Sequence, residues 1–544
     1  MSTAQVQSPR LRPKGSSRVV LSKRSSTNER KAQIRAQRVE AFSSVIVKAM
    51  TALKAVHLDM EESTSLGAPS VPFEAIELKE AMKEDAPAWL EAIDQESRSL
   101  KRNNTFAIMR GTVPNGRKVI SCRWVLRNKL KKNGLIHRRK ARLVARGYEQ
   151  IAGIDYFETF ASVLRYATLR IVLAKAAYED LEIDHIDIET AFLNPTIYEE
   201  IYMTPTKYLE RVFPELEHKD SYIRLRKALY GLKQSPREWF QMVKEAFSVF
   251  GLRAADSDPN LFIGRVLVLL FVDDMLVVGK RDEVDKIKKR ILKEWKGQDL
   301  GPVECFIGFE ITRDRRNRTL TITQSTFIRK LLNRTNMTNA NSTSLPIPAG
   351  TVLKSIDEVE FLLEGDEITL YRQIVGSVLY LSNNTRPDTS YAVGQLARFM
   401  SKPAIIHLRM CKHLLRYLAG TIEVGITYSS RRNVLPLTYA IYTDATWGTE
   451  EDRVSFQGVV VIRYGGAVSW LSQRQKSTAC SSMDAEIIAG HEGAKEAAWM
   501  EKVTNDLGER GLEPYIPTLY CDSVAATQLM KDMKFYIKAK HIEI

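Results

Sequence analysis

Hydrophobic and polar positions follow two different periods along this chain, and each period predicts its own kind of element. Apolar residues recur with helical spacing just after residue 87 and again through residues 374–418. Residues 266–272 and 275–278 are apolar runs of strand length. From about residue 437 to the end, strand and helix patterns alternate. We therefore expect both helices and strands, and the length of 544 residues allows two to four domains.

Local signals indicate where several of these elements begin and end. Residues 119–148 predict a basic β-hairpin that turns at Asn133-Gly134, because this dipeptide is frequent in two-residue hairpin turns. Residues 235–238 read Ser-Pro-Arg-Glu, the pattern of a capping box with proline at the first helical position, and predict the start of a helix. Asp273 and Asp274 lie between the two apolar strands, and we expect them to form a two-residue turn.

Positive charge is concentrated in particular segments. The chain carries a formal net charge of +15 and has a pI near 9.4. Between residues 101 and 148 there are 15 lysines or arginines and no acidic residue, and residues 1–40 hold 10 basic and 2 acidic positions. Such a surplus predicts a polyanionic partner, nucleic acid before anionic membrane. We interpret the N-terminal segment as a mostly disordered basic linker rather than a dedicated binding arm.

Two further features exclude other classes of protein. The longest apolar run, residues 266–272, is far too short to span a bilayer, so we expect no membrane partner. The five cysteines are scattered and form no CxxC pair. Their distribution argues against both a disulfide scaffold and a structural zinc site.

Carboxylates at strand ends are the first candidate chemistry. Asp187 ends an alternating strand, and Asp273 and Asp274 lie at the tip of the apolar hairpin. Nucleotidyl transfer needs carboxylates from separate strands that hold two divalent cations, and magnesium prefers such oxygen ligands. Acids at a hairpin turn are also often only solvated, so the turn alone leaves both interpretations open.

Five segments occur together in an order that is typical of one family. Residues 187–194 (DIETAFLN), 229–239 (LYGLKQSPREW) and 271–274 (FVDD) resemble the three catalytic motifs of copia-type reverse transcriptases, which are part of the Pol polyproteins of LTR retrotransposons. Residues 140–147 (KARLVARG) resemble the fingers strand of that family, and residues 155–160 (DYFETF) resemble the segment after it. The resemblance extends from about residue 86 to the last residue.

This resemblance implies a role for each residue of a polymerase site. It implies that Asp187, Asp273 and Asp274 bind two Mg²⁺ ions, with Mn²⁺ as a substitute, and that Asp274 is the least direct ligand. It further implies that the incoming nucleotide is contacted by Lys140, Arg142, Phe192, Tyr230 and Gly231. Phe192 would crowd a ribose 2′-hydroxyl and so select dNTPs. An ordinary core aromatic residue is an equal interpretation of the same position.

A second set of carboxylates lies near the end of the chain. Asp444 closes an alternating strand, Glu486 lies in the first turns of a helix capped by Ser481, and Asp522 ends a further strand. Acids in this order resemble the metal ligands of RNase H, whose reaction also uses two metal ions. Residues 539–543 (AKHIE) resemble the family's C-terminal signature and would add Glu543 as a fourth carboxylate. Because Ile544 follows at once, we expect the last helix to be missing, and RNase H activity does not follow from the three acids alone.

The resemblance also implies a fold and a layout. The expected fold is α+β, a right-hand polymerase with fingers, palm and thumb, followed by an RNase H-like α/β domain with a mixed five-stranded sheet. The expected regions are a basic linker (1–85), the reverse transcriptase (86–335), a connection (336–436) and a C-terminally truncated RNase H-like domain (437–544).

The implied function is RNA-directed DNA synthesis coupled to degradation of RNA in RNA–DNA hybrids. The implied partners are an RNA template, a DNA primer, their hybrid, dNTPs, and other copies or other Pol and Gag products of the element. A cytoplasmic virus-like particle and the nucleus are the implied locations. The alternative is a catalytically inactive remnant that still binds nucleic acid: the acids at the family's positions favour the enzyme, and the expected truncation favours the remnant.

Overall fold

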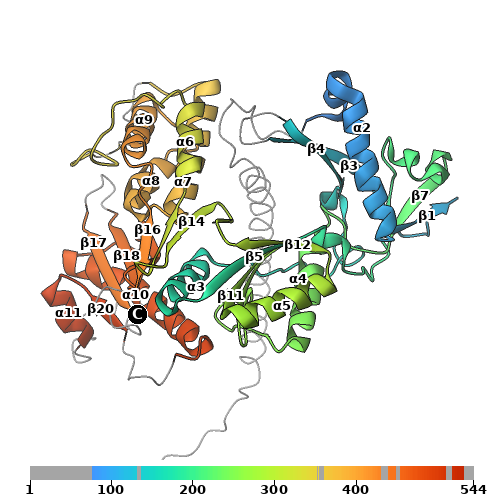
Figure 1. Ribbon diagram of the computed structural model, residues 1–544. Coiled ribbons are helices and arrows are strands. Elements are labelled where there is room, and N and C mark those ends of the chain that lie inside the picture. Colours follow the sequence, from blue (N-terminus) through green and yellow to red (C-terminus); the bar gives the residue numbers. More distant parts are fainter. Residues whose placement is uncertain are drawn as a thin grey trace, which may run out of the picture. The chain divides into compact units, whose positions relative to one another are not determined.

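The computed structural model describes residues 76–130, 136–351, 353, 361–430, 439–448, 454–509 and 517–531. Every element below belongs to one compact unit within residues 57–544. Figure 1 shows the helices and strands, coloured in chain order from blue at the N-terminus to red at the C-terminus. Most of the predicted basic linker, the predicted turn at Asn133-Gly134, and Glu543 lie outside the described residues.

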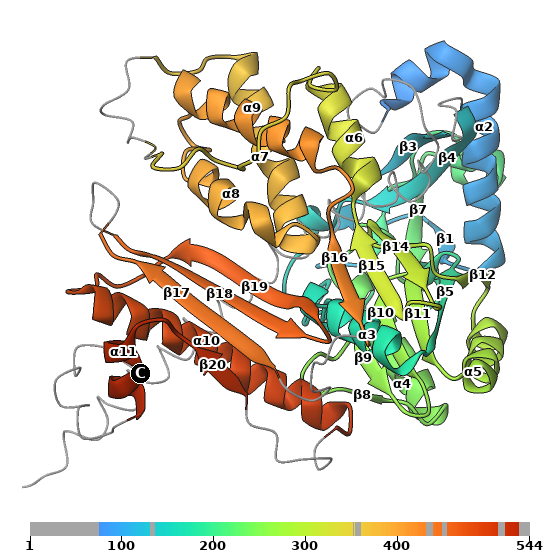
Figure 2. The same cartoon turned by 60° about the vertical axis from the view of Figure 1, so that its left-hand side comes forward.

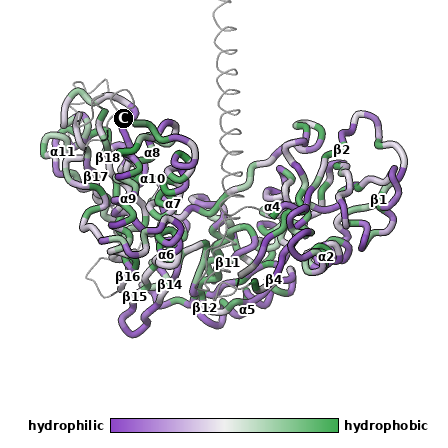
Figure 3. The backbone as a smooth tube through the Cα atoms, turned by 90° about the horizontal axis from the view of Figure 1, so that it is seen from above, coloured by the Kyte–Doolittle hydropathy of each residue, from purple (hydrophilic) through white to green (hydrophobic). Residues whose placement is uncertain are grey.

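A six-stranded sheet in which all neighbouring strands are antiparallel carries the motif aspartates. Its strands follow the order β12-β5-β11-β10-β9-β8. Their bounds are β5 (Glu182–Ile188), β8 (Arg253–Ala254), β9 (Leu261–Ile263), β10 (Leu267–Phe271), β11 (Asp274–Gly279) and β12 (Gly297–Pro302). In Figure 3 the tube around β11 has the green of hydrophobic residues, as expected for a central strand with both faces covered.

Helices α4 (Ser235–Val249) and α5 (Arg281–Glu294) cover one face of this sheet. Trp239 and Phe247 of α4 and Ile287 of α5 pack into the core that the strands provide. Helix α4 begins where the sequence predicts it, but the predicted capping box is wrong. The Ser235 hydroxyl donates to the Leu229 carbonyl at 2.7 Å and accepts from the Leu229 N–H at 3.2 Å, so it closes the preceding loop instead of the helix end.

The basic hairpin packs against a long helix. Strands β3 (Cys122–Leu130) and β4 (Ile136–Ala145) pair antiparallel, as predicted, and contact α2 (Leu78–Arg102). A four-stranded sheet belongs to the same core, with bounds β1 (Phe106–Arg110), β2 (Val119–Ile120), β6 (Tyr202–Met203) and β7 (Ser221–Leu225).

Residues 305–429 combine a small sheet with a helical core. The sheet contains β13 (Cys305–Phe306), β14 (Phe309–Asp314), β15 (Thr319–Thr323) and β16 (Ile426–Ser429). The helices are α6 (Ser325–Arg334), α7 (Asp366–Asn384), α8 (Ser390–Ala397) and α9 (Ile405–Gly420), and they share one apolar cluster. The expected boundary at residue 335 falls between two helices of this cluster, and the domain limits stay a prediction.

The last region is a sheet with a long helix on it. Strands β17 (Ala440–Thr446), β18 (Phe456–Arg463), β19 (Gly466–Arg474) and β20 (Thr518–Tyr520) follow the order β19-β18-β17-β20. Helix α10 (Ser482–Asp506) lies against β17 and β18, and α11 (Val524–Lys531) packs on α10 (Figure 2). Among the described strands of this sheet, β17 and β20 pair parallel and the other neighbours pair antiparallel. The sheet is mixed, as predicted, and the described residues contribute four of the five expected strands.

Helix α3 (Tyr166–Glu179) connects the central sheet with the later regions, since it contacts β11, β15, β16 and β19. Its buried Arg170 donates to the carbonyl of Val468 at 2.8 Å and to that of Asn384 at 2.9 Å. The sheets are mainly antiparallel and the helices are largely grouped apart from the strands, which confirms the predicted α+β class. Within the described residues, no helix is both long enough and apolar enough to cross a membrane.

Candidate active sites

Strand register brings the motif aspartates together at one end of the six-stranded sheet. Asp274 pairs with Phe271 on one side and directly with Asp187 of β5 on the other. Directly opposed residues project from the same face of a sheet, with Cβ atoms about 5 Å apart. The predicted turn is therefore shifted by one residue: Val272 and Asp273 form it, and Asp274 is the first residue of β11. Asp273 and Asp274 are only 5% and 4% exposed, whereas Asp187 is half-buried.

The turn itself has an unusual backbone. Val272 has φ +56°, a conformation that costs a β-branched residue about 1–3 kcal/mol. Two bonds hold it there: the Trp239 indole N–H donates to the Val272 carbonyl at 2.6 Å, and the Ile188 N–H donates to the Asp273 carbonyl at 2.9 Å. The position of Asp273 is thus fixed by a helix on one side and by the Asp187 strand on the other.

Two predicted phosphate-binding residues are electrostatic partners of these acids. Burial and then repulsion from Arg142 lower the pKa of Lys140 to about 8, against the attraction of Asp273. Burial would lower the pKa of Arg142, but Tyr230, Asp273, Glu96 and Asp187 outweigh it and raise that pKa. Arg142 therefore stays cationic, while Lys140 changes its charge near physiological pH.

Strand β4 reaches the nucleotide-pocket residues through its backbone. The Ala145 N–H donates to the Tyr230 carbonyl at 2.8 Å. Gly231 has φ +94°, and a Cβ at that position would lie 2.1 Å from the Ala145 carbonyl oxygen, so only glycine fits here. The Arg142 guanidinium lies 4.9 Å from the centre of the Tyr230 ring, within cation–π distance.

Phe192 meets Tyr230 edge to face, with ring centroids 5.0 Å apart. It also packs, half-buried, against the core beneath the sheet. Phe192 thus packs against the core and also contacts Tyr230, so both interpretations made from the sequence stay open.

Glu96 was missed by the sequence interpretation. It lies on α2, its carboxylate accepts from the Leu143 N–H at 3.4 Å, and it attracts both Arg142 and Lys140. Burial raises its pKa, in spite of these two cations. Only its helical spacing from the buried residues Ile93 and Leu100 could have indicated that it faces the hairpin.

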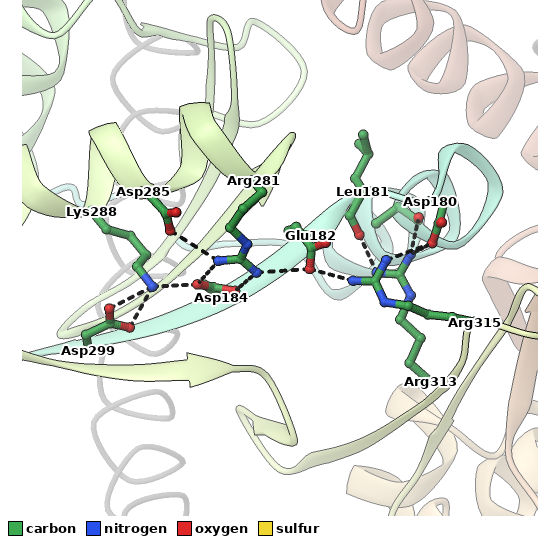
Figure 4. Close-up of polar contacts among 11 residues, drawn as sticks. Asp180, Leu181, Glu182, Asp184, Arg281, Asp285, Lys288, Asp299, Arg313 and Arg315 are labelled. Atoms are coloured by element: carbon green, nitrogen blue, oxygen red, sulfur yellow. Dashed lines mark hydrogen bonds and ion pairs between the residues drawn. The ribbon is translucent and has the colours of Figure 1, made fainter.

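The opposite face of β5 is held by ion pairs (Figure 4). Arg281 of α5 contacts both oxygens of the buried Asp184, at 2.8 and 3.1 Å, and Lys288 contacts it at 2.5 Å. Lys288 also lies 2.7 Å from Asp299 of β12. Burial would raise the pKa of Asp184, but the hydrogen bonds from Arg281 and Lys288 hold it below its ordinary value. These contacts lock β5 between α5 and β12, which fixes the strand that carries Asp187.

The donor chemistry of the three aspartates fits a hard divalent cation. All three offer carboxylate oxygens from two adjacent strands and their turn, which are the ligands that Mg²⁺ and Mn²⁺ prefer. Lys140 interacts electrostatically with Asp273, and Arg142 interacts with both Asp273 and Asp187. The residue types present therefore fit the implied metal, although the ligand atoms of the three aspartates do not all lie within 4.8 Å of one another.

The second carboxylate set lies beside the parallel strands β17 and β20. Asp444 does not close its strand as predicted, because β17 continues to Thr446, and Asp522 follows β20. Tyr442 of β17 pairs with Tyr520 of β20, so Asp444 and Asp522 each lie two residues beyond a paired position. Glu486 of α10 is 7% exposed and accepts from the Ala445 N–H at 3.1 Å. Burial, followed by repulsion from Asp444 and Asp522, raises its pKa. Asp444 and Asp522 themselves are exposed.

Cys521 is the unpredicted member of this second set. Ligand atoms of Glu486, Cys521 and Asp522 lie within 4.8 Å of one another, and within the described ranges no other three His, Cys, Asp or Glu residues do so. The Cys521 thiol donates to Glu486 at 3.6 Å. Asp444 lies outside this group, next to the Ala445 N–H that binds Glu486. As predicted, the Ser481 hydroxyl caps α10, accepting from the Asp484 N–H at 3.1 Å.

Part of the chain matches a known protein family. Residues 103–349 match the family described as reverse transcriptase (RNA-dependent DNA polymerase). This matched region contains β4, the two strands that bear the aspartates, and Tyr230.

Over most of its length the chain is similar to retrotransposon Pol polyproteins, which confirms the predicted copia-type resemblance. It is 35% identical to the Retrovirus-related Pol polyprotein from transposon TNT 1-94 of Nicotiana tabacum, over 84% of this chain and 34% of the relative. It is 34% identical to that from transposon RE2 of Arabidopsis thaliana, over 94% of this chain and 34% of the relative. The chain thus spans about a third of these curated relatives. A solved foamy viral protease-reverse transcriptase in complex with double-stranded DNA is similar with a TM-score of 0.45 and 14% identity, over 81% of this chain and 64% of that one.

Proposed function

We propose that this chain is an RNA-directed DNA polymerase that extends a DNA primer on an RNA template with dNTPs. The observation that carries this proposal is the direct pairing of Asp187 with Asp274, beside a turn that fixes Asp273. The match of residues 103–349 to the reverse transcriptase family supports it.

The proposed site would hold two Mg²⁺ ions on Asp187, Asp273 and Asp274, and the ions would activate the primer 3′-hydroxyl and stabilise the leaving oxygen. Arg142, held against Tyr230, would bind the triphosphate through its planar guanidinium. Lys140 would add a second positive charge, and Gly231 would let the pocket backbone approach the substrate closely. Phe192, braced edge-on by Tyr230, would exclude a ribose 2′-hydroxyl.

We propose a second activity for the C-terminal region, cleavage of RNA in an RNA–DNA hybrid. Glu486 and Asp522 would share divalent ions with Asp444, and their mutual closeness supports this assignment. The four regions expected from the sequence, association with other Pol and Gag products, and a location in cytoplasmic particles and the nucleus belong to the same proposal.

Primer extension tests the polymerase proposal. Incorporation of labelled dTTP on a poly(rA)/oligo(dT) hybrid with Mg²⁺ is measured for the wild type, Asp187→Asn and Asp282→Asn. Asp282 is an exposed acid in the first turn of α5 and serves as the matched control. We expect activity in the wild type and Asp282→Asn and none in Asp187→Asn. If all three proteins bind the hybrid and none extends it, the chain is the inactive nucleic-acid-binding remnant.

A further inference from the structure

The two faces of β5 serve different purposes, and one residue on the aspartate-bearing face is unexplained by the proposed function. Ile186 and Ile188 point into the core beneath α4 and α5, and Asp184 joins the ion pairs on that same side. Side chains alternate along a strand, so His185 and Asp187 share the other face. His185 is therefore a neighbour of the proposed metal ligands.

The register places His185 diagonally across from Asp274. Asp187 pairs with Asp274, and His185 pairs with Leu276, so His185 and Asp274 are diagonal neighbours on one face. A diagonal neighbour is within reach of a long or aromatic side chain. His185 Nε2 lies 3.2 Å from Asp274 Oδ1, and the two residues are 6% and 4% exposed.

The ring orientation of His185 is fixed by packing. The Phe306 ring meets it edge to face, with centroids 5.4 Å apart and an interplanar angle of 84°. An ionised carboxylate can only accept hydrogen bonds, so Nε2 carries the proton when Asp274 is charged. A buried imidazole in this position therefore holds one carboxylate oxygen of Asp274 and leaves the other to a different partner.

We propose that His185 is a positioning residue for Asp274, and that it sets how tightly the palm carboxylates hold their divalent ions. This inference rests on the proposed polymerase function. Partners behind a metal ligand orient it, and losing one typically lowers metal affinity about 10- to 100-fold. Asp273 is fixed by the backbone of its turn, whereas Asp274 is fixed through its side chain by His185.

Metal-dependent assembly of an unreactive complex tests the proposal without catalysis. The full chain is mixed with poly(rA)/oligo(dT) whose primer ends in a dideoxynucleotide, with dTTP, and titrated with Mg²⁺. The Mg²⁺ midpoint of complex formation is measured in a Glu486→Gln background, so that the second carboxylate set does not contribute. His185→Leu removes the hydrogen bond, and His185→Gln places an amide N–H near the original Nε2.

We expect His185→Leu to raise the Mg²⁺ midpoint about tenfold, and His185→Gln to stay close to the unsubstituted protein. Phe247→Leu, in the core on the opposite face of the sheet, is the packing control: it should lower the thermal unfolding midpoint and leave the Mg²⁺ midpoint unchanged. An unchanged midpoint in His185→Leu, or equal shifts in the Leu and Gln variants at equal thermal stability, would overturn the proposal.

Asp187→Asn in the same titration separates this inference from the proposed function. If Asp187→Asn shifts the Mg²⁺ midpoint and His185→Leu does not, only the role of His185 fails. If neither shifts it, the metal site of the proposed polymerase fails with it.

Discussion

The two carboxylate sets differ in what holds them. In the six-stranded sheet, Asp273 and Asp274 are buried, and backbone bonds, strand register and the strained Val272 fix their places. In the C-terminal sheet, Asp444 is exposed within β17 and Asp522 is exposed just after β20, and the buried Glu486 bonds to their chain neighbours, the Ala445 N–H and the Cys521 thiol. Backbone hydrogen bonds and strand register thus place the aspartates of the first site, whereas the second site depends on the Glu486 side chain.

This difference shows that a set of carboxylates can be held in place in two ways. Strand register fixes the position of Asp187 only if β5 itself is held in place. The contacts of Arg281 and Lys288 with Asp184, on the face of β5 opposite to Asp187, hold it. At the second site, burial first and then repulsion from Asp444 and Asp522 raise the pKa of Glu486.

The largest expected effect is at Asp273. Asp273→Asn removes a proposed metal ligand while keeping the turn, and we expect kcat for dTTP incorporation to fall about 10³-fold, the loss of roughly 4 kcal/mol of transition-state stabilisation. Primer extension under single-turnover conditions measures it. Near-normal incorporation by a correctly folded Asp273→Asn would place the polymerase metal site elsewhere.

Glu486→Gln sharpens the contrast at the second site. Because Glu486 is the buried member of the proposed ligand set, the neutral side chain should lower RNA cleavage about 100-fold. It should also raise the thermal unfolding midpoint in the absence of metal at neutral pH, since it removes a buried charge that burial disfavours. Glu501→Gln, an exposed position on the same helix, is the control. A lower unfolding midpoint would contradict the description of Glu486 as an electrostatically unfavourable buried acid.

Arg142→Lys tests the anionic-substrate side of the first site. Lysine keeps the charge but loses the planar fork and its stacking on Tyr230, and we expect KM for dTTP to rise about tenfold, the loss of one charge-assisted hydrogen bond. Steady-state kinetics measures it, with Arg138→Lys, an exposed residue on the same strand, as the control. Equal KM values for the two variants would show that Arg142 does not bind dTTP.

The smallest expected effect is a pH dependence. Since the pKa of Lys140 is lowered to about 8, its charge is lost as pH rises through that value, and the neutral form binds phosphate less well. KM for dTTP should therefore rise several-fold between pH 7 and 9, and it should stay level in Lys140→Arg. A parallel rise in both proteins would assign the pH dependence to another group.

The sequence predicted the elements and the acids of both sites better than it predicted their partners. The strands around Asp273 and the helix from Ser235 follow from apolar period and turn residues. The turn is shifted to Val272 and Asp273 because register against β5, which no local pattern shows, decides which residue begins β11. The roles of Glu96 and His185 depend on contacts between elements, so each reads as an ordinary polar residue in the sequence.

Cys521 illustrates the same limit. Along the sequence it is one of five scattered cysteines, and only the parallel pairing of β17 and β20 under α10 brings it to Glu486. Similarly, α6 follows the strands of the reverse transcriptase region in sequence, yet it shares the apolar cluster of α7, α8 and α9. Long-range packing decides both, and periodicity reports only the local part of it.

The separate nature of the two sites is tested most directly in one reaction. A hybrid with differently labelled primer and RNA strands is incubated with Mg²⁺ and dNTPs, and both labels are followed for the wild type, Asp273→Asn and Glu486→Gln. The account predicts that Asp273→Asn abolishes primer extension and leaves RNA cleavage intact, and that Glu486→Gln does the reverse. Loss of both activities in either variant, with hybrid binding and thermal stability unchanged, would contradict it.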